Sequence, residues 1–262
     1  MENNPRKRRH IRRSDSSWFP GGAFLDGKTQ GHANHSGVVL KRDISPEGDA
    51  ILYLFLKGLG PITVYAPGAS RGRIRFGGAI EPLTWANFNL YRGTKYYYLT
   101  SAEIKEGFWQ LRNDPSKIAK LMEWDVMLCR HLAPRIPCDD VLALFYWSGM
   151  HLKSDAHPLV AEWRFYWKWL RCWGLAPSPE NCAGCGAPIS EARLTLLGFL
   201  CPSCARDGEG ARLSAREMDL LRMSLSAPAR AFAGLFPATG LRGQSHWAEV
   251  NSRLKRYFDA MA

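Results

Sequence analysis

The chain has 262 residues and 46% of them are apolar, which is enough to fill one large hydrophobic core or two modest ones. Its formal charge of +11 favours polyanionic partners, nucleic acid first among them, because neutralising phosphates releases counterions; charge that only maintains solubility is the plainer alternative. The longest apolar runs, 51–56 and 141–147, are too short to cross a bilayer, which argues against a helical membrane protein.

Residues 1–34 combine charge with Ser, Gly and Pro and show no hydrophobic periodicity, so we expect a disordered arm. The first 13 residues carry a net charge of +5, which leaves +6 for the remainder. The arm either adds nonspecific phosphate contacts or has no role, and both readings stay open. No apolar segment follows the basic residues, which argues against a secretory signal and predicts a soluble protein. The scattered cysteines Cys129, Cys138 and Cys172 suit a reducing cytosol.

Residues 35–105 show the pattern of short β-strands separated by turn residues. Gly58 and Gly60 supply one of these turns. The expected strands are 37–44, 50–57, 61–67, 84–91 and 95–104. Five strands in about seventy residues predict a small barrel, and the oligonucleotide-binding (OB) fold is the leading candidate, with an SH3-like barrel as the alternative.

A Gly- and Arg-rich segment connects the third and fourth expected strands. Arg71, Arg73 and Arg75 alternate in it, and an extended backbone would project all three guanidinium groups to one face, where they could contact phosphates. Further cations lie in or beside the strands. The candidate nucleic-acid-binding residues are Lys41, Arg42, Arg71, Arg73, Arg75, Arg92 and Lys95.

Tyrosines are interleaved with these cations: Tyr53, Tyr65, Tyr91, Tyr96, Tyr97 and Tyr98. Cations for the backbone and rings for base stacking are the means by which proteins bind single strands without sequence preference. The plainer alternative is a solvated face with some tyrosines in the core. Strand alternation allows only part of the run 96–98 to face outwards.

From residue 106 to 262 the apolar residues recur with helical periodicity, which predicts a helical domain. Capping residues and prolines mark where helices begin. The expected starts are Asp114-Pro115, Asp139 or Asp140, Pro158, Ser214 with Glu217, and Trp247. The helix over 158–173 is crowded with aromatic residues, which we expect to pack a core; a groove for a partner peptide is the less favoured reading.

A four-cysteine module at 181–205 interrupts the helical domain. Cys182, Cys185, Cys201 and Cys204 form two C-x-x-C pairs separated by fifteen residues, a spacing typical of one tetrahedral zinc ion, and 194–200 has room for a hairpin between them. Four thiolates leave no vacant position for a reactive water, so we predict a structural Zn²⁺. The alternatives are unligated cysteines or a redox pair. A zinc deaminase is a poor fit because no H-x-E precedes the second pair.

No catalytic set is apparent, and we predict a protein that is not an enzyme. The segment 151–157 contains two histidines, a serine and an aspartate but no nucleophile elbow. Walker and dinucleotide-binding motifs are missing, and the carboxylates are dispersed. The competing functions are a zinc-ribbon transcription or translation factor and a hydrolase that uses 151–157.

In combination and in chain order, these segments resemble the RecO family of bacterial recombination mediators over residues 36–258. The matching segments are Gly37-Val-Val-Leu-Lys-Arg42, Asp49-Ala-Ile-Leu-Tyr-Leu-Phe55, Gly60-Pro-Ile-Thr-Val64, Gly68-Ala-Ser-Arg71, Arg75-Phe-Gly-Gly-Ala79, Glu81-Pro82, Leu90-Tyr-Arg-Gly93, Leu99-Thr-Ser-Ala-Glu103, Arg164-Phe165, Gly174-Leu-Ala-Pro177, Cys182 to Cys185, Gly198-Phe-Leu-Cys201 and Leu213-Ser214.

The resemblance implies an OB barrel, a helical domain and, in many members, a four-cysteine zinc site. It also implies binding of single- and double-stranded DNA, annealing of complementary strands, and joint action with RecR to help RecA replace single-strand-binding protein. Such a protein would be cytoplasmic and associated with the nucleoid when on DNA. The chain departs from the family at Pro67, where many relatives have Lys, and the arm before Ser36 has no counterpart.

Overall fold

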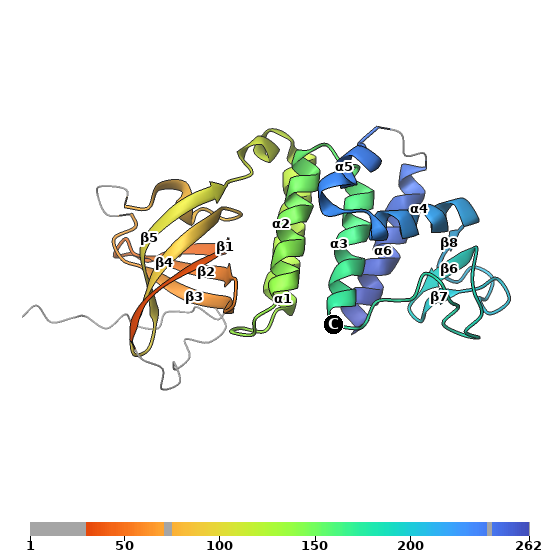
Figure 1. Ribbon diagram of the computed structural model, residues 1–262, viewed down its shortest axis with the longest axis horizontal. Helices are drawn as coiled ribbons and strands as arrows, with labels where there is room; N and C mark the ends of the chain where they lie inside the picture. The colour runs from red at the N-terminus through yellow and green to blue at the C-terminus, as the bar shows by residue number, and fades with distance from the viewer. Residues whose placement is uncertain (1–29, 71–74, 240–242, 262) are drawn as a thin grey trace, which may run out of the picture.

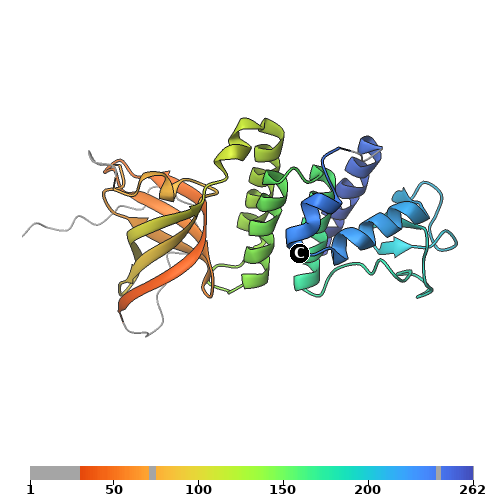
Figure 2. The same cartoon turned by 45° about the horizontal axis from the view of Figure 1, so that its top comes forward.

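A computed structural model of the protein describes residues 30–70, 75–239 and 243–261. The molecule is elongated: a five-stranded barrel forms one end, a small three-stranded sheet lies at the other, and helices fill the space between (Figures 1 and 2). The predicted α+β class, with a barrel followed by a helical part that carries the cysteine module, is confirmed.

The barrel is closed, with the strand order β1-β2-β3-β5-β4. Its strands are β1 (Gly31–Ile44), β2 (Ala50–Leu56), β3 (Gly60–Ala66), β4 (Trp85–Arg92) and β5 (Tyr97–Glu106). β3 and β5 are parallel, β1 pairs with both β2 and β4, and a 3₁₀ turn, η1 (Gly77–Ile80), lies between β3 and β4. This is the order of the OB fold, which decides against an SH3-like barrel.

β1 is longer than the sequence predicts. It begins at Gly31, so residues 31–34, expected in the arm, pair with β4 instead. Residues 32–34 are all exposed, and with no buried face they show none of the alternation that identifies a strand. This part of the strand is held by backbone pairing with β4, which the side-chain pattern does not reveal.

β2 is apolar along its whole length because both of its faces are covered. Leu52 and Leu54 point into the barrel, whereas Tyr53 and Phe55 join a second core shared with the helices. The barrel therefore packs on the helical part through β1, β2 and the first residue of β4, Trp85. β3, β5 and the rest of β4 keep partly exposed residues on the outer face.

The helices occupy the middle of the molecule (Figure 1). They are η2 (Trp109–Asn113), α1 (Pro115–His131), α2 (Asp139–Lys153), α3 (Pro158–Cys172), α4 (Ala215–Ser226), η3 (Ala229–Ala231), α5 (Phe232–Leu235) and α6 (Gln244–Met261). α3 packs against α2, α4 and α6, which explains why its aromatic residues are buried as predicted. In the part of the chain that the structure describes, none of the helices has both the length and the hydropathy to span a bilayer.

Two of the predicted helix starts use the expected caps. Asp114 accepts hydrogen bonds from the N–H groups of Ser116 and Lys117, and Ser214 forms a capping box with Glu217. The prediction for α2 is wrong, because Cys138 is the residue before the helix and Asp139 and Asp140 lie within its first turn. In the first turn both carboxylates still stabilise the helix, because they lie at the positive end of its dipole.

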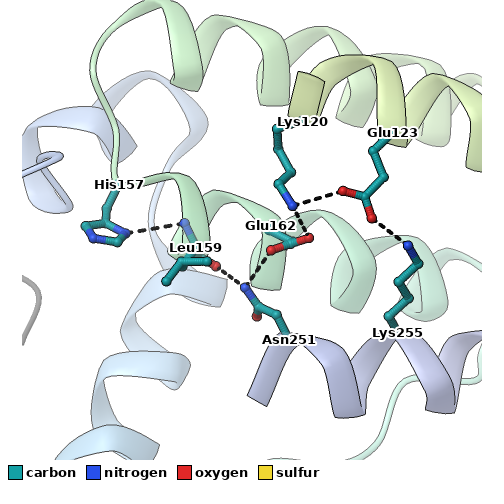
Figure 3. Close-up of polar contacts among 7 residues, drawn as sticks. All are labelled: Lys120, Glu123, His157, Leu159, Glu162, Asn251 and Lys255. Carbon is teal, nitrogen blue, oxygen red and sulfur yellow. Dashed lines mark hydrogen bonds and ion pairs between the residues drawn. The ribbon is translucent and has the colours of Figure 1, made fainter. Parts of the chain in front are cut away.

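A polar network ties α1, α3 and α6 together (Figure 3). The carboxylate of Glu162, on α3, accepts from Lys120 Nζ at 2.7 Å and from Asn251 Nδ2 at 2.9 Å. Lys120 also contacts Glu123, which binds Lys255 of α6. Three helices distant in sequence are thus linked through charged groups that satisfy one another.

Candidate metal centre and nucleic-acid interface

The four cysteines of the predicted zinc site lie together at the end of the molecule opposite the barrel. Their sulfur atoms all lie within 4.8 Å of one another, and the Sγ atoms of Cys185 and Cys201 are 3.9 Å apart. A tetrahedral ion with Zn–S bonds of about 2.3 Å requires sulfur atoms separated by about 3.8 Å. In the described residues this is the one group of three or more such side chains close enough to hold a metal ion.

The backbone around the cysteines favours thiolates. Cys182 is buried, and its sulfur accepts the N–H groups of Cys201 at 3.2 Å and of Gly184 at 3.4 Å. These hydrogen bonds, that of Cys201 first, lower the pKa of Cys182 to about 6. Hydrogen bonding to Cys201 and to the other cysteines raises the pKa of Cys204 to about 12, so the Cys204 thiolate would form only beside a cation.

Local structure holds the two cysteine pairs against each other. β6 (Ala192–Thr195) and β7 (Gly198–Leu200) form the predicted hairpin between them, and β8 (Ala211–Leu213), which the sequence did not indicate, completes the sheet. A Cβ on Gly184 would lie 3.3 Å from the sulfur of Cys204, so glycine lets the second pair approach the first. The donor set and its spacing fit Zn²⁺, and all four positions would be filled.

The predicted phosphate contacts are only partly within the described residues. Arg71 and Arg73 lie outside them, and their common face with Arg75 stays a prediction. Arg75 is exposed; its guanidinium donates to the carbonyl of Pro67 at 3.3 Å and lies 5.0 Å from the ring centroid of Phe76. Arg75 is thus anchored at the base of the basic loop, next to the end of β3.

Arg92 and Lys95 lie in the hairpin that joins β4 to β5. Arg92 is positioned 6.0 Å from the ring centroid of Tyr97, and Lys95 is exposed at the turn. Both cations therefore lie at the end of the barrel where β1 begins, since Arg92 pairs with Gly31.

Lys41 and Arg42 have partners within the protein. A bulge between Val39 and Lys41 reverses the alternation of β1, so Lys41 stands opposite Tyr53 and faces the helices. There its charge opposes the effect of burial, which raises the pKa of Asp125 on α1. Arg42 forms an ion pair with Glu81. The structure therefore puts these two cations apart from Arg92 and Lys95.

Two of the six interleaved tyrosines belong to the cores. Tyr53 is buried between barrel and helices, which raises its pKa to about 12, and Tyr97 lies inside the barrel. Tyr65, Tyr91, Tyr96 and Tyr98 stay partly exposed. The expectation that only part of the run 96–98 faces outwards is confirmed, and the structure now separates the two sets.

Four aromatic side chains from four neighbouring strands form a line across the outside of the barrel, here called the aromatic row: Tyr65, Tyr98, Tyr91 and His32. Strand register makes each the direct neighbour of the next, Tyr65 with Tyr98, Tyr98 with Tyr91, and Tyr91 with His32. Ring centroids are 6.1 Å apart for Tyr65 and Tyr98 and 5.2 Å apart for His32 and Tyr91. The sequence could not order these rings, because they come together only through the strand pairing.

The histidines of 151–157 have separate structural roles. His151 is buried and its Nε2 lies 3.0 Å from the carbonyl oxygen of Ala229. His157 caps α3 by accepting the N–H of Leu159, and Asp155 pairs with Lys117. The two histidines and the aspartate of this segment thus hold structural elements together.

Two family profiles match the chain. The profile described as "Recombination protein O N terminal" matches residues 32–108 and that described as "Recombination protein O C terminal" matches residues 131–240. The first covers the barrel and the second covers α2 to α5 with the four cysteines.

The chain belongs to the RecO family.

Proteins named DNA repair protein RecO are similar to it over much of their length. That of Desulforamulus reducens is 31% identical over 172 residues, covering 64% of this chain and 67% of the relative. That of Anaeromyxobacter dehalogenans (strain 2CP-1) is 32% identical over 181 residues, 66% and 70% of the two chains. That of Symbiobacterium thermophilum is 29% identical over 208 residues, 75% and 81% of the two. The RecO resemblance inferred from the sequence is confirmed.

Proposed function

We propose that this protein acts in DNA repair and homologous recombination by binding single- and double-stranded DNA and annealing complementary strands. The observation that carries the proposal is the match of the whole barrel to the RecO amino-terminal profile, because the barrel is an OB fold, a scaffold that binds oligonucleotides. RecR, single-strand-binding protein and, indirectly, RecA are its proposed partners, in the cytoplasm and on the nucleoid.

Electrostatics supplies the proposed mechanism. A strand held by cations has part of its phosphate charge neutralised, so a second strand meets less repulsion and complementary bases can pair. The proposed contacts are Arg71, Arg73, Arg75, Arg92 and Lys95, with Lys41 and Arg42 adding charge from positions that already have carboxylate neighbours.

The first experiment removes the charge of the basic loop. The triple variant Arg71→Ala, Arg73→Ala, Arg75→Ala should bind a single-stranded oligonucleotide more weakly and with a smaller dependence on salt concentration, by about one unit of slope for each phosphate that is no longer neutralised. The matched control removes three exposed arginines at the opposite end, Arg206, Arg212 and Arg216, with the same change in net charge. Equal salt slopes for the two triple variants would reject the loop as the contact.

The second experiment tests annealing and the partners. Complementary strands are mixed with the protein, bare or coated with single-strand-binding protein, and the loop variant should lose annealing in parallel with binding. RecR should bind the loop variant as well as the natural protein, because we place partner contacts on the helical part. Annealing at the uncatalysed rate, by protein shown to bind DNA, would overturn the proposed mechanism.

A further inference from the structure

We propose that the aromatic row is a base-stacking platform for single-stranded nucleic acid and that it makes the protein prefer unpaired strands to duplex. The inference rests on the proposed function, that the barrel binds DNA, and adds where on the barrel the bases lie. It commits to one occupant, a single strand, on a face that the helices leave uncovered.

The rings of the row are available to a ligand. The interior of the barrel is filled by other side chains of the same strands, Val64, Leu90 and Leu99 among them. Tyr98, at the centre of the row, lies over the turn of the β4–β5 hairpin, where a Cβ on Gly93 would be 3.1 Å from the ring. Glycine thus lets the ring lie against the backbone, so that one edge is supported and the rest stays partly exposed.

Tyr96 adds a supporting ring. It packs edge-on against Tyr65 with centroids 4.8 Å apart, while the Tyr91 hydroxyl donates to Gln30 Oε1 at 3.0 Å. Rings held in this way lose little freedom when a base stacks on them, which favours binding. A row of supported rings therefore suits successive bases, each of which presents a π-face whatever its identity.

Next to the row on the same outer face lies a line of neutral polar groups. Asn34 donates to Asn89 at 2.8 Å, and Asn89 donates to the hydroxyl of Ser101 at 2.8 Å. Carboxamides and hydroxyls can bond to the edges of unpaired bases, whereas in a duplex both the faces of the bases and their pairing edges are occupied. The combination of rings and amides thus selects for unpaired bases.

The charges near the platform complement a strand that crosses it. Lys95 and Arg92 lie in the hairpin beside Tyr91 and Tyr98, and near the Tyr65 end of the row Arg75 donates to the carbonyl of Pro67. Glu103, further along β5, is paired with Lys105. Cations therefore lie beside the two middle rings and at the Tyr65 end of the row, where they could contact the phosphates of a strand whose bases stack on the rings.

The test compares the loss of a ring with its retention at one position. Tyr98→Leu removes the central ring, and Tyr98→Phe keeps it and removes only the hydroxyl. Binding is measured by fluorescence anisotropy to three probes of equal length: oligothymidylate, a strand of abasic sites with the same phosphates, and a duplex. Tyr98→Leu should bind oligothymidylate about tenfold more weakly than Tyr98→Phe, and the two should be equal on the abasic strand and on duplex.

Each outcome decides the question. Equal loss on all three probes, or no loss on any, overturns the platform while DNA binding by the natural protein upholds the proposed function. Loss of RecR binding with unchanged binding of oligothymidylate would make the row a protein contact and also overturn it. If the natural protein binds none of the probes, the proposed function itself fails. Should Tyr98→Leu not fold, the pair Tyr91→Leu and Tyr91→Phe carries the same comparison one strand away.

Discussion

The carboxylate of Asp139 accepts a hydrogen bond from the backbone N–H of Gly58 at 2.8 Å. Gly58 lies in the turn between β2 and β3, and Asp139 opens α2, so the contact joins the barrel to the helical part. Close backbone packing lies beside it, since a Cβ on Gly60 would be 2.1 Å from the carbonyl oxygen of Ile136. The aspartate that the sequence suggested as a helix cap instead contacts the barrel.

Replacing Asp139 by Ala should lower the unfolding free energy by about 1 kcal/mol more than replacing Asp140 by Ala. Both substitutions remove a carboxylate from the first turn of α2, but the hydrogen bond to Gly58 belongs to Asp139. Urea unfolding of the two variants measures the difference. Equal losses would mean that the contact contributes nothing beyond the helix dipole.

Removal of a cysteine should unfold the module at the far end of the molecule without acting on the barrel. Because a structural zinc site contributes its binding energy to folding, we expect Cys182→Ala to lower the stability by at least about 3 kcal/mol and to lower the affinity for DNA much less. Thermal unfolding and metal analysis of the purified protein test this, with the exposed Cys172→Ala as control. Protein that folds with full stability and without stoichiometric zinc would contradict the assignment.

The sequence predicted those features whose signals are local. The cysteine spacing, the capping box at Ser214 and the glycine turns of the barrel depend on residues a few positions apart, and each was confirmed. The position of Lys41 could not be predicted, because a bulge in β1 turns its side chain from the barrel side to the helices. The aromatic row could not be predicted either, because it is set by the register between strands. His32 lies in a segment without hydrophobic periodicity, so the sequence did not place it in a strand.

His151 should make the protein less stable in mild acid. Burial lowers its pKa to about 4 from 6.5, and the nearby charges of Arg164 and Lys168 act in the same direction. The unfolded chain therefore takes up a proton at a pH where the folded protein does not. The stability is complete above pH 6.5 and is lost as the pH falls towards 4, by about 2 kcal/mol between pH 7 and pH 5.

The variant His151→Gln isolates this effect. Glutamine can still donate to the carbonyl of Ala229 but has no proton to gain, so its stability should fall less between pH 7 and pH 5. Unfolding in urea at several pH values provides the comparison. Burial also lowers the pKa of His157. Because His157 is present in both proteins, its contribution to the pH dependence cancels in the difference between them. Parallel curves for the two proteins would show that His151 does not titrate as proposed.

Glu162 should matter more to stability than Glu123, although both bind Lys120. The side chain of Glu162 is 8% exposed and that of Glu123 is 33% exposed, so water can replace the partner of the second carboxylate and not of the first. Glu162→Gln removes the charge of the more buried partner of Lys120 and should cost about 2 to 3 kcal/mol, whereas Glu123→Gln should cost less than about 1 kcal/mol. The two variants carry the same change of charge and atom, which makes each the control for the other. Chemical unfolding measures both, and a loss below about 1 kcal/mol for both variants would place the stability of the α1–α3–α6 contact in its apolar packing and not in the network of Figure 3.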